Sequence, residues 1–386
     1  MTGRTRLLVD GVFFQRAQTG IARVWRSLLP RLAQRMDVIL LDRGNSPHIL
    51  NVETIPFPSY VSDAVAPTAA ESIAIEALCR HYSAEVFAST YYSTSLQTPA
   101  LQLVYDMIPE ILGFDLSARD WQEKEAALLF GRKHVCISGS TRTDLLRLYP
   151  EIRPEQATVA HCGIERETFF PRGMGEVDEF RRRHDLAGAY LMLVGSRVQA
   201  NGYKNGGHLF EALSGMARRD DLTILCVGGE MEVPTLRMGG RSIPVRRVEL
   251  SDDDLARAYC GAEALVYPSL YEGFGMPVAE AMACGCPVIT TRHASLSEVA
   301  GEAAIFVSGR DPVEMRAALT AIRDPVTRQS LAKSGIERAR GFSWDAMADH
   351  IADGVEQLAR EARDGRHAAF LSEWARLRRL QADVDF

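Results

Sequence analysis

Two glutamates, Glu272 and Glu280, are separated by seven residues in the stretch YEGFGMPVAEAMACGCPVITT, residues 271–291. A glycine-rich loop and Pro277 lie between them, and a proline here suits the first position of a helix, where its missing N–H costs nothing. The free amides of such a helix end point back into the loop and favour a bound phosphate. Glu280, expected on the first helical turn, would lean toward the same ligand, because helical side chains tilt toward the helix N-terminus. The spacing therefore predicts two carboxylates flanking a phosphate.

A second loop, LMLVGSRVQANGYKNGGHL, carries Arg197 and Lys204 between a predicted strand and a predicted helix. Two cations from one such loop can clamp a diphosphate leaving group without a divalent ion. A sugar nucleotide has the matching layout, with ribose hydroxyls on one side of the diphosphate and hexose hydroxyls on the other. We therefore expect a nucleotide-sugar substrate, no metal and no cofactor. Plainer interpretations stay open: solvated loop charges for Arg197, Lys204 and Glu272, and a partner of the helix dipole for Glu280.

Short β-rich runs alternate with longer helical patterns along the chain, which is typical of parallel α/β architecture. A polar segment at 172–187 separates two such sets, so we expect two doubly wound domains facing each other across a cleft. Ligands of such sheets bind beyond the carboxyl ends of the strands, and a strand ending at Tyr267-Pro268-Ser269 places Glu272 there. The predicted strands cover 6–10, 36–42, 85–89, 101–106, 134–138, 157–161, 190–196, 222–228, 244–249, 264–269, 287–291 and 303–308. The predicted helices cover 20–34, 68–82, 118–131, 139–149, 205–219, 252–260, 277–284, 312–323, 325–340 and 344–360.

The composition restricts the class of protein. Of the 386 residues, 46% are apolar and 24% are charged, which is ordinary for a globular protein, and the net charge of -6 argues against a nucleic-acid partner. The seven cysteines are scattered through apolar runs, which indicates reduced thiols in a cytoplasmic protein. The N-terminal apolar segment is too short for a signal peptide, and no window is long and apolar enough for a transmembrane helix. We therefore expect a cytoplasmic protein, with the inner face of the membrane as a further candidate location.

Three other motifs do not support a metal or cofactor site. Ser251 followed by Asp252, Asp253 and Asp254 matches a helix cap with acids in the first turn better than a metal-binding triplet. The pair in Cys284-Gly-Cys286 is too closely spaced for the usual zinc site. The loop Gly273-Phe-Gly275 lacks the third glycine of a dinucleotide fingerprint, so a dehydrogenase is not supported.

The segment PSLYEGFGMPVAEAMACGCPVITT closely resembles the E-x7-E signature of the retaining glycosyltransferase family four, whose members adopt the two-domain GT-B fold. The segment VGSRVQANGYKN is similar to the diphosphate-binding loop of that family. In the N-terminal half, DGVFFQRAQTGIARV resembles the first glycine loop of the family and VYDMIPE its central strand-end motif. The resemblance covers nearly the whole chain. The N-terminal motifs look most like those of bacterial mannosyl- and rhamnosyltransferases of surface polysaccharide synthesis.

This resemblance implies a role for each matching residue. It places Glu272, Arg197, Lys204 and Asp106 in the catalytic set, with Glu272 on the donor hexose, the two cations on the diphosphate and Asp106 facing the acceptor. Among the implied donor-binding residues, Glu280 binds the ribose, and Gly273, Phe274, Gly275 and Met276 bind through their backbone amides. The segment from Val248 to Leu250 lines the base, and Gly20 belongs to the N-terminal loop that approaches the phosphate. The chain departs from the family at Tyr105, where many relatives have His, and at Cys162, where many have Asn. Both departures concern the acceptor side.

The implied activity is transfer of a hexose, with retention, from a nucleotide-diphosphate sugar to a hydroxyl of a saccharide or lipid-linked acceptor. GDP-mannose or a related GDP-deoxyhexose is the preferred donor, and UDP-glucose stays open. The product would belong to cell-surface polysaccharide such as lipopolysaccharide. Two alternatives also stay open: a sugar-nucleotide epimerase of the same fold, and a non-catalytic assembly subunit that retains the nucleotide site.

The expected domain limits follow chain order. Residues 1–175 would form an acceptor-binding domain, residues 186–365 a nucleotide-sugar-binding domain, and residues 366–386 a helical tail. The apolar positions of the tail predict packing against one of the domains, with peripheral association with a membrane surface as the alternative.

Overall fold

The structure is a computed structural model that describes residues 4–16, 19–61, 68–195, 202–217 and 219–384. It contains two compact units of parallel α/β structure. Unit 1 comprises Met1–Cys162 and Trp344–Phe386, and unit 2 comprises Gly163–Ser343.

Unit 1 is built on parallel strands in the order β3-β2-β1-β4, followed by β5-β6-β7. A parallel bridge between Phe87 and Ala100 joins the two groups. The first strand is central in its group, so the chain winds outward on both sides of it. The strands are β1 Arg6–Asp10, β2 Asp37–Asp42, β3 Val52–Pro56, β4 Val86–Ser89, β5 Leu101–Val104, β6 Lys133–Cys136 and β7 Ala157–Val159. The helices are the 3-10 turns η1 Val12–Arg16 and η2 Pro154–Gln156, and α1 Gly20–Arg35, α2 Thr68–His81, α3 Ile108–Ile111, α4 Arg119–Phe130, α5 Gly139–Leu148, α13 Trp344–Arg363 and α14 Ala368–Val384.

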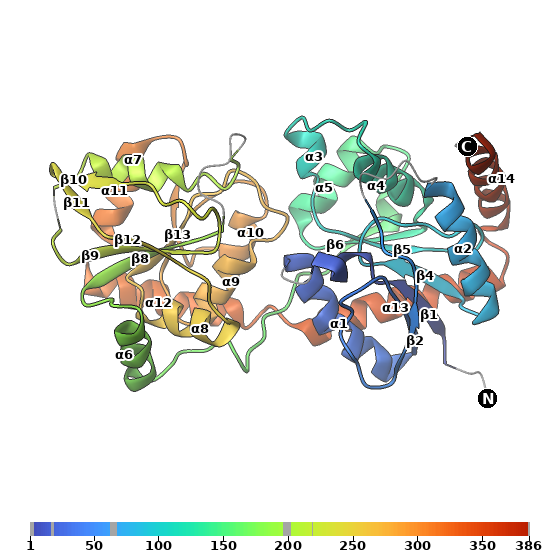
Figure 1. Cartoon of the computed structure of the whole chain (residues 1–386), viewed down its shortest axis with the longest axis horizontal. Coiled ribbons are helices and arrows are strands. Elements are labelled where there is room, and N and C mark those ends of the chain that lie inside the picture. Colours follow the sequence, from blue (N-terminus) through green and yellow to red (C-terminus); the bar gives the residue numbers. More distant parts are fainter. Residues whose placement is uncertain (1–3, 17–18, 62–67, 196–201, 218, 385–386) are drawn as a thin grey trace. The chain divides into compact units, whose positions relative to one another are not determined.

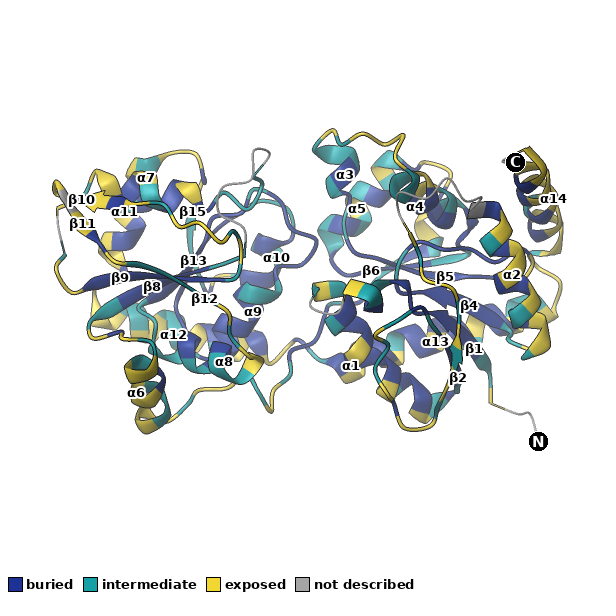
Figure 2. Cartoon of the chain, in the orientation of Figure 1, coloured by how far each residue is buried: buried dark blue, intermediate teal, exposed yellow. Residues whose placement is uncertain are grey.

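The inner strands of unit 1 (β1, β2, β4 and β5) are buried on both faces because helices cover both (Figures 1 and 2), whereas the edge strand β3 is largely exposed. Leu8 of β1 lies opposite Ile39 of β2 and Phe87 of β4 in the parallel register. These three side chains share a buried cluster with residues of α2, α4 and α14, among them Ile75 and Phe130. One face of the sheet therefore packs against helices drawn from both ends of the chain.

Helix α13 shows that the expected domain limits are wrong. The sequence places residues 344–365 in the C-terminal domain, but α13 packs against unit 1. Its apolar stripe, which includes Ile351 and Val355, is fully buried, and Arg35 of α1 contacts Asp349 at 3.1 Å and Asp353 at 2.6 Å. An amphipathic pattern shows that a helix has an apolar face but does not identify the surface that covers it. Residues 368–384 of the predicted tail form α14, which also belongs to unit 1.

Unit 2 is one parallel sheet of six strands in the order β12-β9-β8-β13-β14-β15. It begins earlier than expected, and the polar segment at 172–187 contains α6 instead of a linker between domains. The strands are β8 Ala189–Val194, β9 Leu222–Val227, β12 Val245–Val248, β13 Ala264–Tyr267, β14 Val288–Thr291 and β15 Ile305–Val307, with an antiparallel hairpin of β10 Leu236–Met238 and β11 Arg241–Ile243. The helices are α6 Met174–Arg183, α7 Gly207–Ser214, α8 Asp252–Gly261, α9 Met276–Ala283, α10 Leu296–Ala300, α11 Pro312–Ala321 and α12 Pro325–Ala339.

The strand order of unit 2 determines where a ligand can bind. From β8 the chain moves one way to β9 and β12, then returns to the other side of β8 for β13 and the last two strands. The order therefore reverses between β8 and β13. A crevice forms at such a switch point, outside the carboxyl ends of the two strands.

The predicted strands and helices are all present, with ends that differ by a few residues. The sequence patterns missed β3, the β10–β11 hairpin, α3, α6 and α10, most of which are short. None of the helices in the described part of the chain is both long and apolar enough to cross a bilayer.

A buried ion pair joins four segments of unit 1 at the carboxyl end of β1. The side chains of Asp10 and Arg43 are both fully buried, with Nε to Oδ1 at 2.7 Å and Nη2 to Oδ2 at 2.8 Å. Ser93, which follows β4, donates to Asp10 Oδ2 at 2.7 Å, and Glu71 of α2 lies 3.2 Å from Arg43. Burial works against the guanidinium, but Asp10 and Glu71 outweigh it and raise the pKa of Arg43.

Replacing Asp10 with alanine should lower the free energy of unfolding of unit 1 by about 3–5 kcal/mol, because it leaves a buried guanidinium facing only the partly exposed Glu71. Urea unfolding of the full chain measures the loss. In the matched control, Glu373→Ala removes the partner of Arg376 in a surface pair and should leave the free energy of unfolding nearly unchanged, because water screens the pair. Equal losses in the two variants would contradict the assigned role of the buried pair.

Candidate active site

The loops that follow β8 and β13 meet at the switch point of unit 2. Lys204 lies in the first loop and Glu272 in the second, and Lys204 Nζ is 3.0 Å from Glu272 Oε1. Tyr267, the last residue of β13, lies between them: its hydroxyl is 2.9 Å from Lys204 Nζ and 2.8 Å from Glu272 Oε1. Two of the predicted catalytic residues are therefore in direct contact. Arg197 lies outside the described residues.

Glu272 is held through one of its two oxygens. Oε1 accepts from Lys204, from the Tyr267 hydroxyl and from Ser269 Oγ at 2.9 Å. Oε2 accepts no hydrogen bond from the described residues, although the residue is only 8% exposed. The carboxylate is therefore fixed in orientation by Oε1 while Oε2 is available to a ligand hydroxyl.

The charges in this cluster are stable near neutral pH. Burial disfavours the Lys204 ammonium, but Tyr267 and Glu272 outweigh that effect and raise the pKa of Lys204 well above its ordinary value of 10.5. Burial, reinforced by the Glu272 carboxylate, raises the pKa of Tyr267 above 10.0, so the phenol stays neutral and can donate. An ammonium has three N–H groups. Since Tyr267 and Glu272 are its acceptors in the described residues, Lys204 has one N–H left for an anion.

The glycine loop before α9 requires a glycine at position 275. Gly275 has φ +96°, in the left-handed region, and a Cβ there would lie 2.8 Å from Leu296 Cδ2. The Ser295 hydroxyl lies 2.8 Å from the Glu272 carbonyl oxygen and 2.9 Å from that of Phe274. The backbone amides of Gly275 and Met276 donate to no acceptor in the described residues. They form the N-terminal end of a helix, where an anion is favoured.

Phe274 and Glu280, two other residues of the E-x7-E segment, are both buried. The Phe274 side chain is buried against Phe342, with ring centroids 5.3 Å apart, so only its backbone can meet a ligand. The helix begins at Met276, which makes Pro277 its second residue and places Glu280 in the second turn instead of the first. Glu280 is buried, at 4% exposure, and its role on a ribose stays a prediction.

The predicted base-binding segment lies at the same end of the sheet. Val248 ends β12, which pairs with β9, and the Gly228 amide donates to the Val248 carbonyl oxygen at 2.9 Å. Val248 and Leu250 are both half-buried. Because β12, β9, β8 and β13 run parallel, this segment, Lys204 and Glu272 all follow the carboxyl ends of strands in one sheet.

Asp106 and Gly20 belong to unit 1. Asp106 follows β5; its Oδ1 accepts the Ile108 amide at 3.0 Å, and its carbonyl oxygen accepts from Lys124 Nζ at 3.0 Å. Lys124 is nearly buried and pairs with Glu110 at 2.8 Å, so a buried ion pair supports the Asp106 backbone. Gly20 is the exposed first residue of α1, and a Cβ there would meet nothing within 4 Å. No neighbour in the described chain therefore requires a glycine at this position.

The two departures from the family are core residues of unit 1. Tyr105 is buried, accepts from Trp25 Nε1 at 2.5 Å and donates to the Thr90 carbonyl oxygen at 3.1 Å. Cys162 is also buried, and burial raises the pKa of its thiol to about 12. Both substitutions therefore have a packing role.

Sequence reasoning missed four residues that build this site. Tyr267 and Ser269 orient Glu272, and Ser295 holds the loop backbone. Asn205, with φ +53°, donates to the carbonyl oxygens of Pro268 at 3.2 Å and Gly309 at 2.7 Å and so joins the two loops. Polar residues at strand ends were the only signal for them in the sequence, and it does not show which ones converge.

The acidic run at the start of α8 is confirmed as a helix cap. Ser251 Oγ accepts the Asp254 amide at 3.2 Å. Arg183 and Arg257 bind the Asp254 carboxylate, and the hydrogen bond from Arg183 lowers the pKa of Asp254 to about 2. In the described residues, no group of three or more His, Cys, Asp or Glu is arranged to hold a metal ion.

Residues 188–324 match the sequence family described as "Glycosyl transferases group 1". The chain is 40% identical over 220 residues to "O-antigen chain mannosyltransferase B" of Escherichia coli, covering 55% of this chain and 57% of that protein. It is 31% identical over 224 residues to "MMP alpha-(1->4)-mannosyltransferase" of Mycolicibacterium hassiacum, covering 55% and 51%. It is also 31% identical over 220 residues to "D-inositol 3-phosphate glycosyltransferase" of Thermomonospora curvata, covering 51% of each. The chain thus spans about half the length of the curated relatives it matches.

Solved structures resemble nearly the whole chain. Sucrose-phosphate synthase from Thermosynechococcus elongatus gives a TM-score of 0.72 at 21% identity, covering 92% of this chain and 99% of that one. WaaG, a glycosyltransferase involved in lipopolysaccharide biosynthesis, gives 0.70 at 15% identity, covering 91% and 99%. These likenesses confirm the predicted GT-B fold.

Gly275→Ala should lower the free energy of unfolding by about 1–3 kcal/mol, because it places a Cβ in a left-handed conformation against Leu296. Chemical unfolding monitored in unit 2 measures the loss. Gly20→Ala is the contrasting change, with open space around its Cβ, and should leave stability unchanged or slightly increased. A neutral Gly275→Ala variant would mean that the loop can adopt another conformation.

The contribution of Lys204 to stability should not depend on pH between about pH 7 and pH 9.5. A raised native-state pKa gives stability that is fully present below the unfolded-state value of about 10.5 and is lost as the pH rises through the native-state pKa. The test compares the unfolding free energy of the wild type with that of Lys204→Met at both pH values, using the exposed Lys333→Met as the control. A difference that shrinks by pH 9.5 would contradict the raised pKa.

Proposed function

We propose that the chain transfers a hexose from a nucleotide-diphosphate sugar to a hydroxyl acceptor, with retention at the anomeric carbon. The match of residues 188–324 to the family described as "Glycosyl transferases group 1" supports this proposal. The observation that carries this proposal is the contact between Lys204 and Glu272 at the switch point of unit 2. It places a cation and an available carboxylate oxygen beside an open helix end. A diphosphate with a sugar attached needs these three groups.

Each group has a specific role in the proposed donor complex. The remaining N–H of Lys204 and the amides of Gly275 and Met276 bind the diphosphate, and Glu272 Oε2 accepts from hexose hydroxyls. Glu280 binds the ribose, and Val248 to Leu250 line the base. Arg197 adds a second cation. In this assignment the whole donor binds at the carboxyl end of the unit 2 sheet.

The proposed chemistry breaks the anomeric C–O bond to the diphosphate and forms a new bond to the acceptor oxygen on the same face of the sugar. The diphosphate leaves with the electron pair, and the acceptor proton passes to one of its oxygens or to Asp106. Charge that develops on the leaving group is stabilised by Lys204 and the helix-end amides, which are already in place. This provides the leaving-group stabilisation without a metal ion.

GDP-mannose or a related GDP-deoxyhexose is the proposed donor, and cell-surface polysaccharide synthesis is the proposed setting. Two relatives with 40% and 31% identity are named as mannosyltransferases, one of O-antigen chains. A structure at 15% identity is titled as a complex with UDP-glucose, which keeps that donor as the alternative. The proposed acceptor is a saccharide or lipid-linked saccharide. The proposed location is cytoplasmic, at the inner face of the membrane.

Calorimetric titration of the full chain with GDP, UDP, ADP and dTDP, in the presence of EDTA, tests the donor site. We expect selective binding of GDP, because the proposed clamp needs no divalent ion. Binding of UDP alone would make a UDP-sugar the proposed donor in place of a GDP-sugar. If none of the four binds, with or without magnesium, the transferase assignment is overturned in favour of a non-catalytic role.

Glu272→Gln should reduce turnover of the nucleotide sugar by about a hundredfold while changing the affinity for free nucleotide little, because Glu272 binds the hexose. The control Glu302→Gln changes an exposed glutamate of unit 2 and should have no effect. NMR of the product reports the anomeric configuration. An inverted product would exclude retention, and product formed without acceptor would indicate an epimerase.

A further inference from the structure

A pocket of about 510 Å³ opens at the amino ends of the strands in unit 2, the end opposite to Lys204 and Glu272. Its lining residues are Arg181, Ala189, Arg219, Gly261, Ala262, Glu263, Arg323 and Arg328. Ala189 begins β8, and Glu263 immediately precedes β13. The pocket has the size of a small-molecule site, and none of the predicted donor residues lines it.

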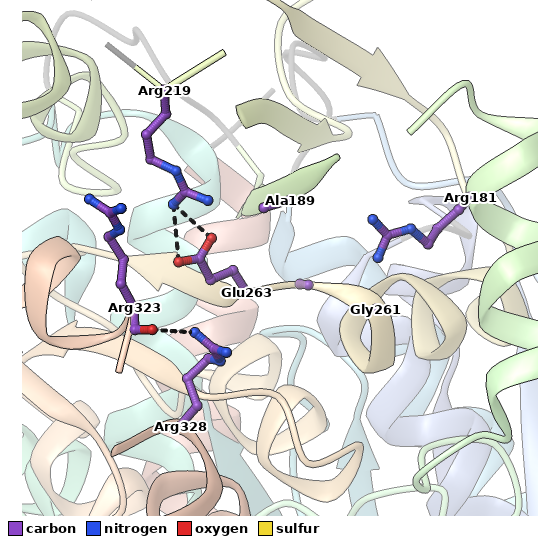
Figure 3. A pocket seen from close by; sticks show the side chains of 8 residues that line it. Arg181, Ala189, Arg219, Gly261, Glu263, Arg323 and Arg328 are labelled. Atoms are coloured by element: carbon purple, nitrogen blue, oxygen red, sulfur yellow. Dashed lines mark hydrogen bonds and ion pairs between the residues drawn. The ribbon is translucent and has the colours of Figure 1, made fainter. Parts of the chain in front are cut away.

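Four arginines surround this pocket and one acid lies inside it (Figure 3). Arg219 is already paired: its Nη1 lies 2.9 and 3.1 Å from the two oxygens of Glu263, and its Nε and Nη2 bind Asp221. Arg219 is therefore shared between two carboxylates, Glu263 in the pocket lining and Asp221, which does not line the pocket. These three groups together carry a single negative charge.

The other three arginines keep hydrogen-bond donors for a ligand. Arg181 binds the carbonyl oxygens of Leu186 and Gly188 through Nε and Nη2, and Nη1 has no acceptor in the described residues. Arg328 uses only Nη1, which binds the carbonyl oxygens of Ile322 and Arg323 at 3.1 and 2.9 Å. These backbone contacts fix both guanidinium groups without neutralising them.

Arg323 is exposed, and its guanidinium has no hydrogen-bond acceptor or ion-pair partner in the part of the chain that the structure describes. In Figure 3 the Arg323 guanidinium lies beside the Arg219–Glu263 pair and no dashed line reaches it, whereas the Arg323 carbonyl oxygen is joined to Arg328. Asp324 caps α12, where its Oδ2 accepts the Thr327 amide at 2.9 Å. Two carboxylates act electrostatically on these arginines without a hydrogen bond or ion pair among the described residues: Asp221 on Arg323 and Asp324 on Arg328. The positive charge of Arg181, Arg323 and Arg328 is therefore only partly offset.

We propose that this arginine pocket binds a ligand with several phosphate groups, such as a polyphosphate or a phosphorylated metabolite. Guanidinium groups with fixed orientation and free N–H pairs suit phosphate oxygens, which accept two parallel hydrogen bonds from one arginine. Ala189, Gly261 and Ala262 are small, so side chains leave the space between the arginines open. The site is separate from the proposed donor site, because the two occupy opposite ends of the same sheet.

Calorimetric titration of the full chain with sodium tripolyphosphate tests the proposal. Lys204→Ala is used as the background, so that binding at the proposed donor site does not contribute. We expect saturable binding that weakens as the salt concentration rises, since exposed charges are screened. Arg323→Gln should weaken it about tenfold or more, because it removes a charge-assisted donor. An absence of binding in this background overturns the proposal.

Matched variants separate the pocket from general surface charge. Arg237→Gln changes an exposed arginine of β10 that does not line the pocket and should leave tripolyphosphate affinity unchanged. Arg181→Gln should weaken binding as Arg323→Gln does. Equal affinity in Arg323→Gln, Arg181→Gln and Arg237→Gln would overturn the assignment. Thermal unfolding of each variant confirms that the fold is intact.

A vesicle assay distinguishes two sources of the same phosphate chemistry. Vesicles that contain phosphatidic acid are sedimented with the wild type and with Arg323→Gln. Capture of the wild type that is lost in the variant identifies a lipid headgroup as the source, whereas tripolyphosphate binding without capture identifies a free metabolite. Capture that persists in Arg323→Gln excludes the pocket as a lipid site.

Discussion

The contact between Lys204 and Glu272 is the interaction on which the proposed site depends. It is possible only because the order of the strands reverses between β8 and β13, so that the loops after these two strands become neighbours. The Tyr267 hydroxyl joins the two charges at 2.9 and 2.8 Å, one on the half-buried Lys204 and one on the buried Glu272. Because Lys204 and Tyr267 both bind Oε1 of Glu272, Oε2 and one N–H of the Lys204 ammonium remain for a ligand. The groups of the proposed site are thus already held in position by one another.

Buried charge has a similar structural role in unit 1, where two buried ion pairs hold loop backbones in place. Arg43, Asp10 and Ser93 join the ends of β1 and β4 to the loop after β2, and Lys124 with Glu110 supports the backbone at Asp106. Burial of a charge is costly unless it is paired and hydrogen-bonded. The carboxyl ends of the strands in each unit therefore depend on networks that hold loop backbones in place. In unit 2 the corresponding network is left incomplete, which suits a binding site.

The two ends of the unit 2 sheet have different electrostatic character. At the carboxyl end, cation and anion are balanced around an open helix terminus. At the amino end, Arg181, Arg323 and Arg328 surround a pocket in which the one lining acid, Glu263, is paired with Arg219. Strand β13 connects the two ends, because Glu263 precedes it and Tyr267 ends it. A ligand in the arginine pocket would therefore bind next to the strand that positions the proposed donor residues.

The sequence alone determined the α/β class, nearly all the longer helices and strands, the E-x7-E loop and the cap at Ser251, because hydrophobic periodicity, proline and glycine act over short distances along the chain. It also identified Lys204 and Glu272 as residues of one site. The tertiary structure decided what contacts what: that α13 covers unit 1, that Tyr105 is a core residue, that Tyr267 and Ser269 orient Glu272, and that four arginines from separate segments share a pocket. Apart from the short-range contacts of Tyr267 and Ser269 with Glu272, these contacts join residues far apart in sequence, and local patterns do not encode which surfaces meet.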